Sequence, residues 1–130
     1  MRLLLDTHIA VWAVVNDDRL TQKARSLIET EDDICVSIAS VWEIAIKYSI
    51  GPRTAGTLPI SGAEAHTCFV DAGFVLVPIE QKHIAKLEQL PWFHRDPFDR
   101  LLVATAMTSK RWLLTQDAAL FAYSDSVLSA

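Results

Sequence analysis

The segment Leu-Leu-Leu-Asp-Thr-His, residues 3–8, decides the fold. Three consecutive leucines predict a short strand that is buried on both faces, which is typical of a parallel sheet covered by helices. Residues 9–15 form an apolar stretch, and a helix is predicted over residues 8–15. The acidic residue Asp6 stands between this strand and this helix, at the carboxyl end of the strand.

The same alternation of short apolar runs and longer helical patterns continues along the chain. Further strands are predicted over residues 34–37, 74–77, 112–115 and, at an edge of the sheet, 127–128. Helices are predicted over residues 21–30, 40–50, 61–73, 80–90 and 96–109, with a short one near 117–121. Strands separated by helices form a parallel sheet with helices on both faces. We therefore expect an α/β fold with a central parallel sheet of four to five strands.

Several helix ends are marked by capping residues. Ser61 and Glu64 have the spacing of a capping box, and Asp96 followed by Pro97 is a typical helix start. Residues 52–59, bounded by prolines, predict a loop. No linker is long or polar enough to divide the chain, so we expect a single domain over residues 1–130.

Composition narrows the classes of function. The chain has 130 residues, 51% apolar and 22% charged, which is typical of a globular domain. Its 16 acidic and 12 basic side chains give a net charge of −4. This charge argues against a protein that coats nucleic acid, but it allows an enzyme that acts on nucleic acid at one localised site. Two isolated cysteines, Cys35 and Cys68, fit a reducing cytoplasm, Cys35 being predicted to be buried. No segment is long enough to predict a membrane span.

Acidic residues follow the predicted strands. Asp6 comes after the first strand and Asp117 after the fourth, while Glu43 lies one turn into the helix that follows the second. Asp96 and Asp99 begin the helix that precedes the fourth strand. Because parallel sheets bind ligands at the carboxyl ends of their strands, these acids are expected to gather at one edge of the sheet.

Several carboxylates in one site repel one another and raise each other's pKa unless a cation intervenes. No lysine is predicted to neutralise them, although Arg100 adjoins Asp99. Carboxylate oxygens suit Mg²⁺ or Mn²⁺. Such ions polarise phosphodiesters and activate water, so the pattern suggests metal-dependent phosphodiester hydrolysis.

Each acid also has a structural interpretation. Glu43 can complete a capping box with Ser40 or pair with Lys47 on the surface of its helix. In helical projection Glu43 lies at the border of a predicted core stripe. That stripe comprises Ile38, Val41, Trp42, Ala45 and Ile46.

The aspartates are open to the same kind of interpretation. Asp96, Asp99 and Asp117 can each serve a helix start alone. Asp6 is harder to explain in this way, because a carboxylate at the end of an all-leucine strand is costly to bury unpaired.

Four segments, 3–8, 36–44, 94–102 and 114–117, resemble the PIN-domain ribonucleases, in the branch that supplies the toxins of VapBC-type toxin–antitoxin modules. The stretch His-Arg-Asp-Pro-Phe-Asp-Arg, 94–100, is the most specific part of the resemblance. The resemblance implies a three-layer sandwich and a Mg²⁺- or Mn²⁺-dependent endoribonuclease. It also implies inhibition by a cognate antitoxin and assembly as a homodimer.

Residues carry over by position. The acidic quartet corresponds to Asp6, Glu43, Asp99 and Asp117, with Asp6 and Asp99 as the principal metal ligands and Asp96 as a weaker candidate. Thr115 matches a hydroxyl position that holds a carboxylate or a water. The chain departs from the pattern at Thr105, where a glutamine is expected.

Other side chains near these motifs have open roles. His94 is predicted to shape the loop before Asp96, with substrate contact as the alternative. Four basic residues are candidate phosphate contacts, although each can be a solvated surface charge: Arg53, Lys47, Arg95 and Arg100. Arg100 can instead pair with an acid, and Thr115 is a further candidate for substrate binding.

The large aromatic side chains are predicted to pack in the core: Trp12, Trp42, Trp92 and Phe93. Stacking on unpaired bases, or contact with a protein partner, is the alternative for any that are exposed. The resemblance adds an antitoxin groove near the first helices, where Trp12 lies.

Three other functions compete with the nuclease. A haloacid-dehalogenase-like phosphatase needs a second aspartate two residues after Asp6, where this chain has His8. A response-regulator receiver domain needs a pair of acids near the end of the first strand, where Asp6 is alone. The convergence of so many acids in one place argues against a non-catalytic interaction module, whose binding does not require them.

Overall fold

The computed structural model of the protein describes residues 1–51 and 58–130. Five strands form one parallel sheet in the order β3-β2-β1-β4-β5. They are β1 (Arg2–Leu5), β2 (Asp33–Ser37), β3 (Val75–Val77), β4 (Trp112–Thr115) and β5 (Val127–Ser129). The predicted parallel sheet is confirmed, and Val127 and Leu128 lie in an edge strand as expected.

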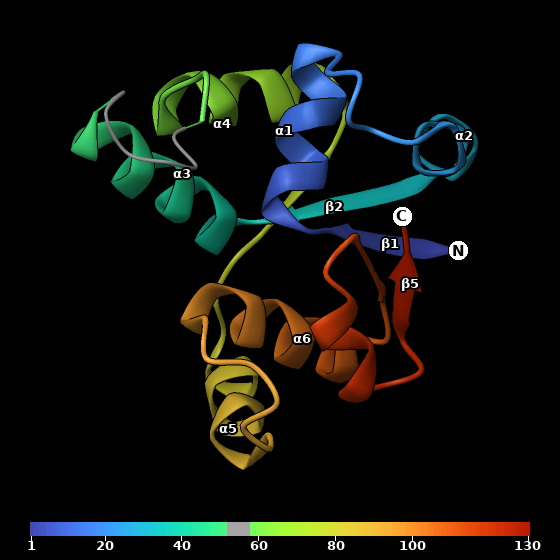
Figure 1. The fold of residues 1–130 in the computed structure, drawn as a ribbon, viewed down its shortest axis with the longest axis vertical. Helices are drawn as coiled ribbons and strands as arrows, with labels where there is room; N and C mark the ends of the chain where they lie inside the picture. The colour runs from blue at the N-terminus through green and yellow to red at the C-terminus, as the bar shows by residue number, and fades with distance from the viewer. Residues whose placement is uncertain (52–57) are drawn as a thin grey trace.

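Helices cover both faces of this sheet. They are α1 (Thr7–Val15), α2 (Gln22–Thr30), α3 (Ile38–Ile50), α4 (Gly62–Asp71), α5 (Gln81–Gln89) and α6 (Pro97–Ser109), with a 3₁₀ helix η1 (Ala118–Ala122). In Figure 1, α1 and α4 lie above the strands, and α5 and α6 lie below them. The arrangement is a three-layer α/β sandwich, as expected.

The core is divided between the two faces of the sheet. In β1, Leu3 and Leu5 point into the cluster under α1, α2 and α4, and Leu4 points into the cluster under α5 and α6. This is the alternation that a strand imposes on successive side chains. Cys35 of β2 is buried in the second cluster, as predicted.

Local signals located most helix ends. Ser61 and Glu64 form the predicted capping box of α4, and the Asp96 carboxylate caps α6, with Pro97 at its first position. The predicted loop 52–59 falls mostly on residues 52–57, outside the described part of the chain. Across residues 1–51 and 58–130, no helix combines the length and apolarity needed to cross a membrane.

The predicted core stripe of α3 is wrong. Its buried positions include Ser40 and Glu43, whereas Trp42 is 57% exposed. The helix is apolar around most of its circumference, so periodicity alone could not choose its buried face. Ser37, not Ser40, caps the helix, its hydroxyl accepting from the Ala39 N–H at 3.0 Å.

Candidate functional site

The carboxyl end of the sheet opens onto a cavity of about 450 Å³. All five acids singled out from the sequence line it: Asp6, Glu43, Asp96, Asp99 and Asp117. They come from the ends of β1 and β4 and from helices α3 and α6. Parallel strands bring these segments, which are distant in the sequence, to one edge of the sheet, as expected for acids at the carboxyl ends of the strands.

Asp6 is fixed on both of its carboxylate oxygens. Leu5 pairs with Leu114 in the β1–β4 ladder, so Asp6 and Thr115 follow side by side. The Thr115 hydroxyl donates to Asp6 Oδ2 at 2.6 Å, and the Thr7 N–H donates to Oδ1 at 2.7 Å. Burial outweighs these bonds and raises the pKa of Asp6. Asp6 is therefore oriented, although its negative charge is poorly solvated.

Glu43 is held from two sides and is only 3% exposed. The Thr7 hydroxyl donates to its Oε1 at 2.7 Å, and Lys47 Nζ lies 2.9 Å from its Oε2. The expectation that no lysine neutralises the acids is thus wrong, because Lys47 lines the same cavity. Ser40, whose hydroxyl lies 2.8 Å from that of Thr7, supports this arrangement instead of capping the helix.

Asp96 and Asp99 begin α6 but are engaged differently. Asp96 Oδ1 accepts from the N–H groups of Phe98 and Asp99, at 2.8 and 3.2 Å. Among the described residues, the Asp99 carboxylate has only an ion-pair contact with His94, at 3.5 Å. Burial and the neighbouring carboxylates, Asp6 first among them, raise the pKa of Asp99 to about 8. An added cation would therefore stabilise the ionised form of Asp99.

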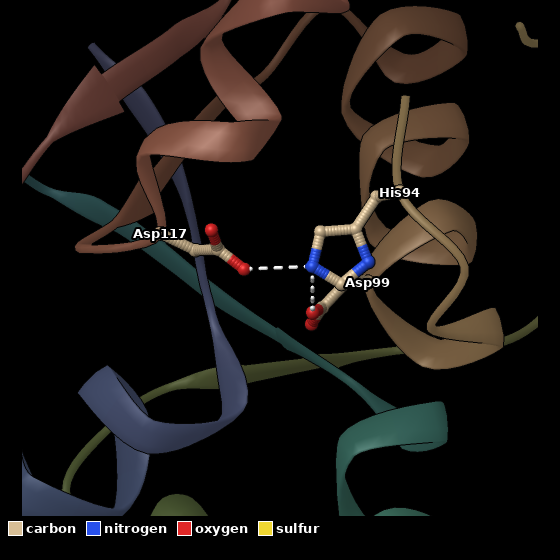
Figure 2. A group of neighbouring side chains, drawn as sticks. All are labelled: His94, Asp99 and Asp117. Atoms are coloured by element: carbon tan, nitrogen blue, oxygen red, sulfur yellow. Dashed lines mark hydrogen bonds and ion pairs between the residues drawn. The ribbon is translucent and has the colours of Figure 1, made fainter. Parts of the chain in front are cut away.

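His94 links two of the acids (Figure 2). Its Nε2 lies 2.9 Å from Asp117 Oδ2 and 3.5 Å from Asp99 Oδ2. Its Nδ1 accepts the Asp96 N–H at 3.0 Å, so we assign the ring proton to Nε2. The predicted role in shaping the loop is confirmed. The contact with Asp99 and Asp117 was missed, although the place of His94 in the 94–102 motif was a signal for it.

The donor set fits a hard divalent cation. One carboxylate oxygen of Asp99 and one of Asp117 lie within 4.8 Å of each other. Asp6 and Glu43 add oxygens to the same cavity. Carboxylate oxygens of this number suit Mg²⁺ or Mn²⁺, and the raised pKa of Asp99 marks charge that such an ion would compensate.

A family model of the PIN domain matches residues 3–125. The chain belongs to the PIN-domain family. Proteins of this family are generally nucleases that use divalent metal ions. No curated protein matches the chain in sequence.

Solved structures with the same fold cover nearly the whole PIN domain. VapBC2 from Rickettsia felis, bound to a promoter DNA fragment, is similar with a TM-score of 0.69 and 15% identity, over 100% of this chain and 98% of that one. A toxin–antitoxin complex from Klebsiella pneumoniae is similar with a TM-score of 0.66 and 19% identity, over 97% of this chain and 95% of that one. FitAcB from Neisseria gonorrhoeae is similar with a TM-score of 0.64 and 18% identity, over 98% of this chain and 95% of that one. At these identities the likeness establishes the fold.

One basic residue predicted to contact substrate has another role in this PIN domain. Arg100 is 3% exposed, and its guanidinium donates to the carbonyls of Pro91 and Leu87, at 2.9 and 3.1 Å. Arg100 is not among the residues that line the cavity, and within residues 1–51 and 58–130 it pairs with no acid. Its guanidinium is therefore not free to contact a substrate phosphate, and the Thr115 hydroxyl is engaged with the Asp6 carboxylate. Arg53 lies outside the residues that the structure describes.

The prediction that the large aromatics are buried is wrong for three of four. Trp42, Trp92 and Phe93 are exposed, while Trp12 packs against the core and lines the cavity. The sequence offered one signal for Trp92 and Phe93, their place in a loop after Pro91.

Proposed function

We propose that this PIN domain is a metal-dependent endoribonuclease that acts as the toxin of a toxin–antitoxin module. The observation that carries the proposal is the convergence of five carboxylates on one cavity, with the pKa of Asp99 raised to about 8 by burial and by its neighbours. The family's general activity supports the nuclease. The solved toxin–antitoxin complexes of the same fold support the biological role.

Asp6 and Asp99 are the proposed principal ligands of a Mg²⁺ or Mn²⁺ ion, and Glu43 and Asp117 complete the set directly or through water. Asp96 is a weaker candidate, because one of its oxygens already caps α6. When bound, the ion would lower the pKa of a water molecule and compensate charge on an RNA phosphate.

The remaining groups of the site position these acids. The Thr115 hydroxyl fixes the Asp6 carboxylate, and the Thr7 hydroxyl fixes Glu43. The Lys47 ammonium limits the repulsion between Glu43 and the other acids. The imidazole of His94 stands between Asp99 and Asp117 with its Nε2 proton directed at them. Each ligand therefore starts close to its working orientation, which reduces the ordering cost of binding metal and substrate.

The proposed partners are an RNA substrate, a cognate antitoxin and a second copy of the chain. Free Cys35 and Cys68 agree with action in the cytoplasm. We further infer that residues 1–130 act as one domain, since both core clusters share the single sheet. The family match removes the phosphatase and the receiver domain, and a non-catalytic PIN-fold module remains the alternative.

Asp6→Asn and Asp99→Asn variants test the nuclease. Each is expected to reduce RNA cleavage with Mg²⁺ or Mn²⁺ by about 100-fold or more, since even outer partners of a metal cost about 10–100-fold. Each should also abolish growth inhibition on expression. Asp32→Asn, at an exposed position before β2, is the matched control and should behave as wild type.

A wild-type protein that cleaves no RNA with either ion, and that is as toxic as both variants, would establish the non-catalytic module. Thermal unfolding with Mn²⁺ tests the metal separately. The unfolding temperature of the wild type should rise with the Mn²⁺ concentration, and that of Asp99→Asn should not.

A further inference from the structure

The loop between α5 and α6 exposes two large aromatic side chains beside the candidate site. Trp92 is 76% exposed and Phe93 is 53% exposed. Both belong to the segment Trp-Phe-His-Arg, 92–95, whose third residue contacts Asp99 and Asp117. Two adjacent exposed aromatics at such a place point to a binding surface, because an aromatic side chain left in water forgoes the free energy of burial.

The indole of Trp92 is held in place from beneath. The guanidinium carbon of Arg100 lies 3.8 Å from the ring centroid. Arg100 is itself buried and fixed by backbone carbonyls of the last turn of α5 and of the α5–α6 connection. One face of the indole is therefore covered by an immobile cation, and its high exposure leaves the other face available for stacking.

The following two residues are fixed as well. The Phe93 ring packs on Tyr123 with centroids 5.1 Å apart, and the His94 N–H donates to the Tyr123 hydroxyl at 2.9 Å. The loop thus enters the site as an anchored segment. Rings held this way lose little conformational entropy when a ligand binds.

Trp92 lies close to the acids along the chain. It precedes His94 by two residues, which span at most about 7 Å between Cα atoms. His94 Nε2 is 2.9 Å from Asp117. Arg95 comes next, is exposed, and has no hydrogen-bond or ion-pair partner among residues 1–51 and 58–130. An aromatic platform and an unpaired cation therefore flank the histidine that touches the carboxylates.

We propose that Trp92 is a stacking subsite for an unpaired nucleobase of the RNA substrate, and that Arg95 contacts a phosphate of the same strand. The inference rests on the proposed nuclease and specifies its substrate as a single-stranded segment, whose bases are free to stack. Arg100 then acts as a positioning residue that presents the indole. The free cation of Arg95 favours a phosphate-bearing ligand over an apolar protein segment, and unpaired bases stack on aromatic side chains in RNA recognition generally.

Binding without cleavage tests this subsite. The full chain carrying Asp6→Asn is titrated, without divalent metal, into a labelled short oligoadenosine and into its abasic counterpart, and fluorescence anisotropy is recorded. Trp92→Leu, added to Asp6→Asn, should weaken binding of the oligoadenosine about 5- to 100-fold, since stacking on one base contributes about 1–3 kcal/mol. The abasic strand should bind both proteins equally. Trp92→Phe should retain most of the affinity.

Two controls accompany this comparison. Trp112→Leu removes a partly exposed tryptophan at the amino end of β4, the opposite edge of the sheet, and should leave binding of both strands unchanged. Arg95→Gln should weaken both strands equally and lower the slope of log affinity against log salt by about 0.7 to 1.

The proposal is overturned if Trp92→Leu weakens the abasic strand as much as the oligoadenosine, or if it weakens neither. It is also overturned if Trp92→Leu leaves RNA binding intact but weakens binding of the antitoxin encoded beside the toxin, which would make Trp92 a protein anchor. The experiments distinguish failure of this subsite from failure of the proposed nuclease activity. A wild type that cleaves RNA while Trp92→Leu has no effect refutes the subsite alone, and base-dependent binding through Trp92 without cleavage refutes the nuclease alone.

Discussion

Asp99 is a carboxyl group whose environment disfavours its charge. It is largely buried, and Asp6, Asp96, Glu43 and Asp117 all add negative potential around it, so its pKa rises from 3.8 to about 8. In the unfolded chain the same group keeps its ordinary pKa. Between about pH 4 and pH 8 the folded protein therefore binds a proton that the unfolded chain has lost, and this proton stabilises the folded state.

The first prediction is that ionisation of Asp99 lowers the free energy of unfolding of the metal-free protein as the pH rises from about 4 to about 8. Below pH 4 both states are protonated and the ionisation of Asp99 has no effect, whereas above pH 8 its full cost is present. Asp99→Asn should consequently be about as stable as wild type near pH 4 and progressively more stable towards pH 8. Urea unfolding in EDTA at several pH values measures the difference.

The comparison with Asp99→Asn is needed because other groups titrate in the same range. Burial lowers the pKa of His83, which makes stability rise with pH through the titration of that side chain. His83 is unchanged in the variant, so its contribution cancels in the difference. A constant difference between the two proteins from pH 4 to pH 8 would contradict the raised pKa. With saturating Mn²⁺ the order should reverse near pH 8, because the ion binds the ionised carboxylate.

At the residue scale, sequence was informative where the partner of a side chain is itself a sequence signal. Asp6 was identified because an acid ends an apolar strand, and Asp96 because a proline follows it. The role of Arg100 was not predictable, because its acceptors are the Tyr123 hydroxyl and, for the most part, backbone carbonyls of residues 87, 90 and 91. Every residue has a carbonyl, so nothing in the sequence marked those as the ones that turn toward Arg100.

At the scale of elements, α3 and α4 approach each other more closely than most side chains permit. A Cβ atom placed on Gly62 would lie 2.8 Å from the Cβ of Ala45 and 3.1 Å from the carbonyl oxygen of Val41. Both atoms belong to the α3 backbone or adjoin it directly, so neither can rotate away. The glycine at the first position of α4 therefore sets the distance between these helices.

The second prediction follows from this contact. Gly62→Ala should destabilise the protein by about 1–3 kcal/mol, as overpacking of a closely packed core does, despite the better helix propensity of alanine. The measurement is chemical unfolding followed by circular dichroism. Ala63→Gly, at the next and exposed position, is the control for propensity and should cost at most about 1 kcal/mol.

Ala45→Gly distinguishes the clash from other effects. Alone it should cost about 1 kcal/mol, because glycine is unfavourable within a helix. Combined with Gly62→Ala it should recover part of the loss, since the 2.8 Å contact is removed. Strict additivity of the two changes would show that α4 already moves away from α3 in Gly62→Ala.

The elements differed in how well they could be predicted, for a physical reason. Strands and caps depend on neighbouring residues, and the sequence located β1, β4 and the start of α6 correctly. The buried face of α3 depends on tertiary contacts, with Thr7 of α1 and with Gly62 of α4. Because α3 is apolar almost all round, only those contacts decide that Glu43 turns inward and Trp42 outward.

At the scale of the whole molecule, α3 presents a row of apolar side chains to the solvent. Ile38, Trp42 and Ile46 follow one another at spacings of four residues and are all exposed. The Trp42 ring also packs edge-on against Phe98, with centroids 5.0 Å apart, so the row continues onto α6. None of these side chains is ionisable, and such a surface can meet its own copy across a two-fold axis without opposing like charges.

The last prediction concerns the proposed homodimer, for which this row is the expected interface. Light scattering after size exclusion should give the mass of a dimer for the wild type at micromolar concentration. Ile46→Glu should give a monomer, because the two-fold axis brings both new charges into one apolar contact. Val70→Glu, at an exposed apolar position of α4, is the matched control and should remain dimeric. Since both positions are exposed, each variant should keep its stability within about 0.5 kcal/mol. A monomeric wild type, or a dimer that survives Ile46→Glu, would rule out this interface and leave the apolar row to another partner.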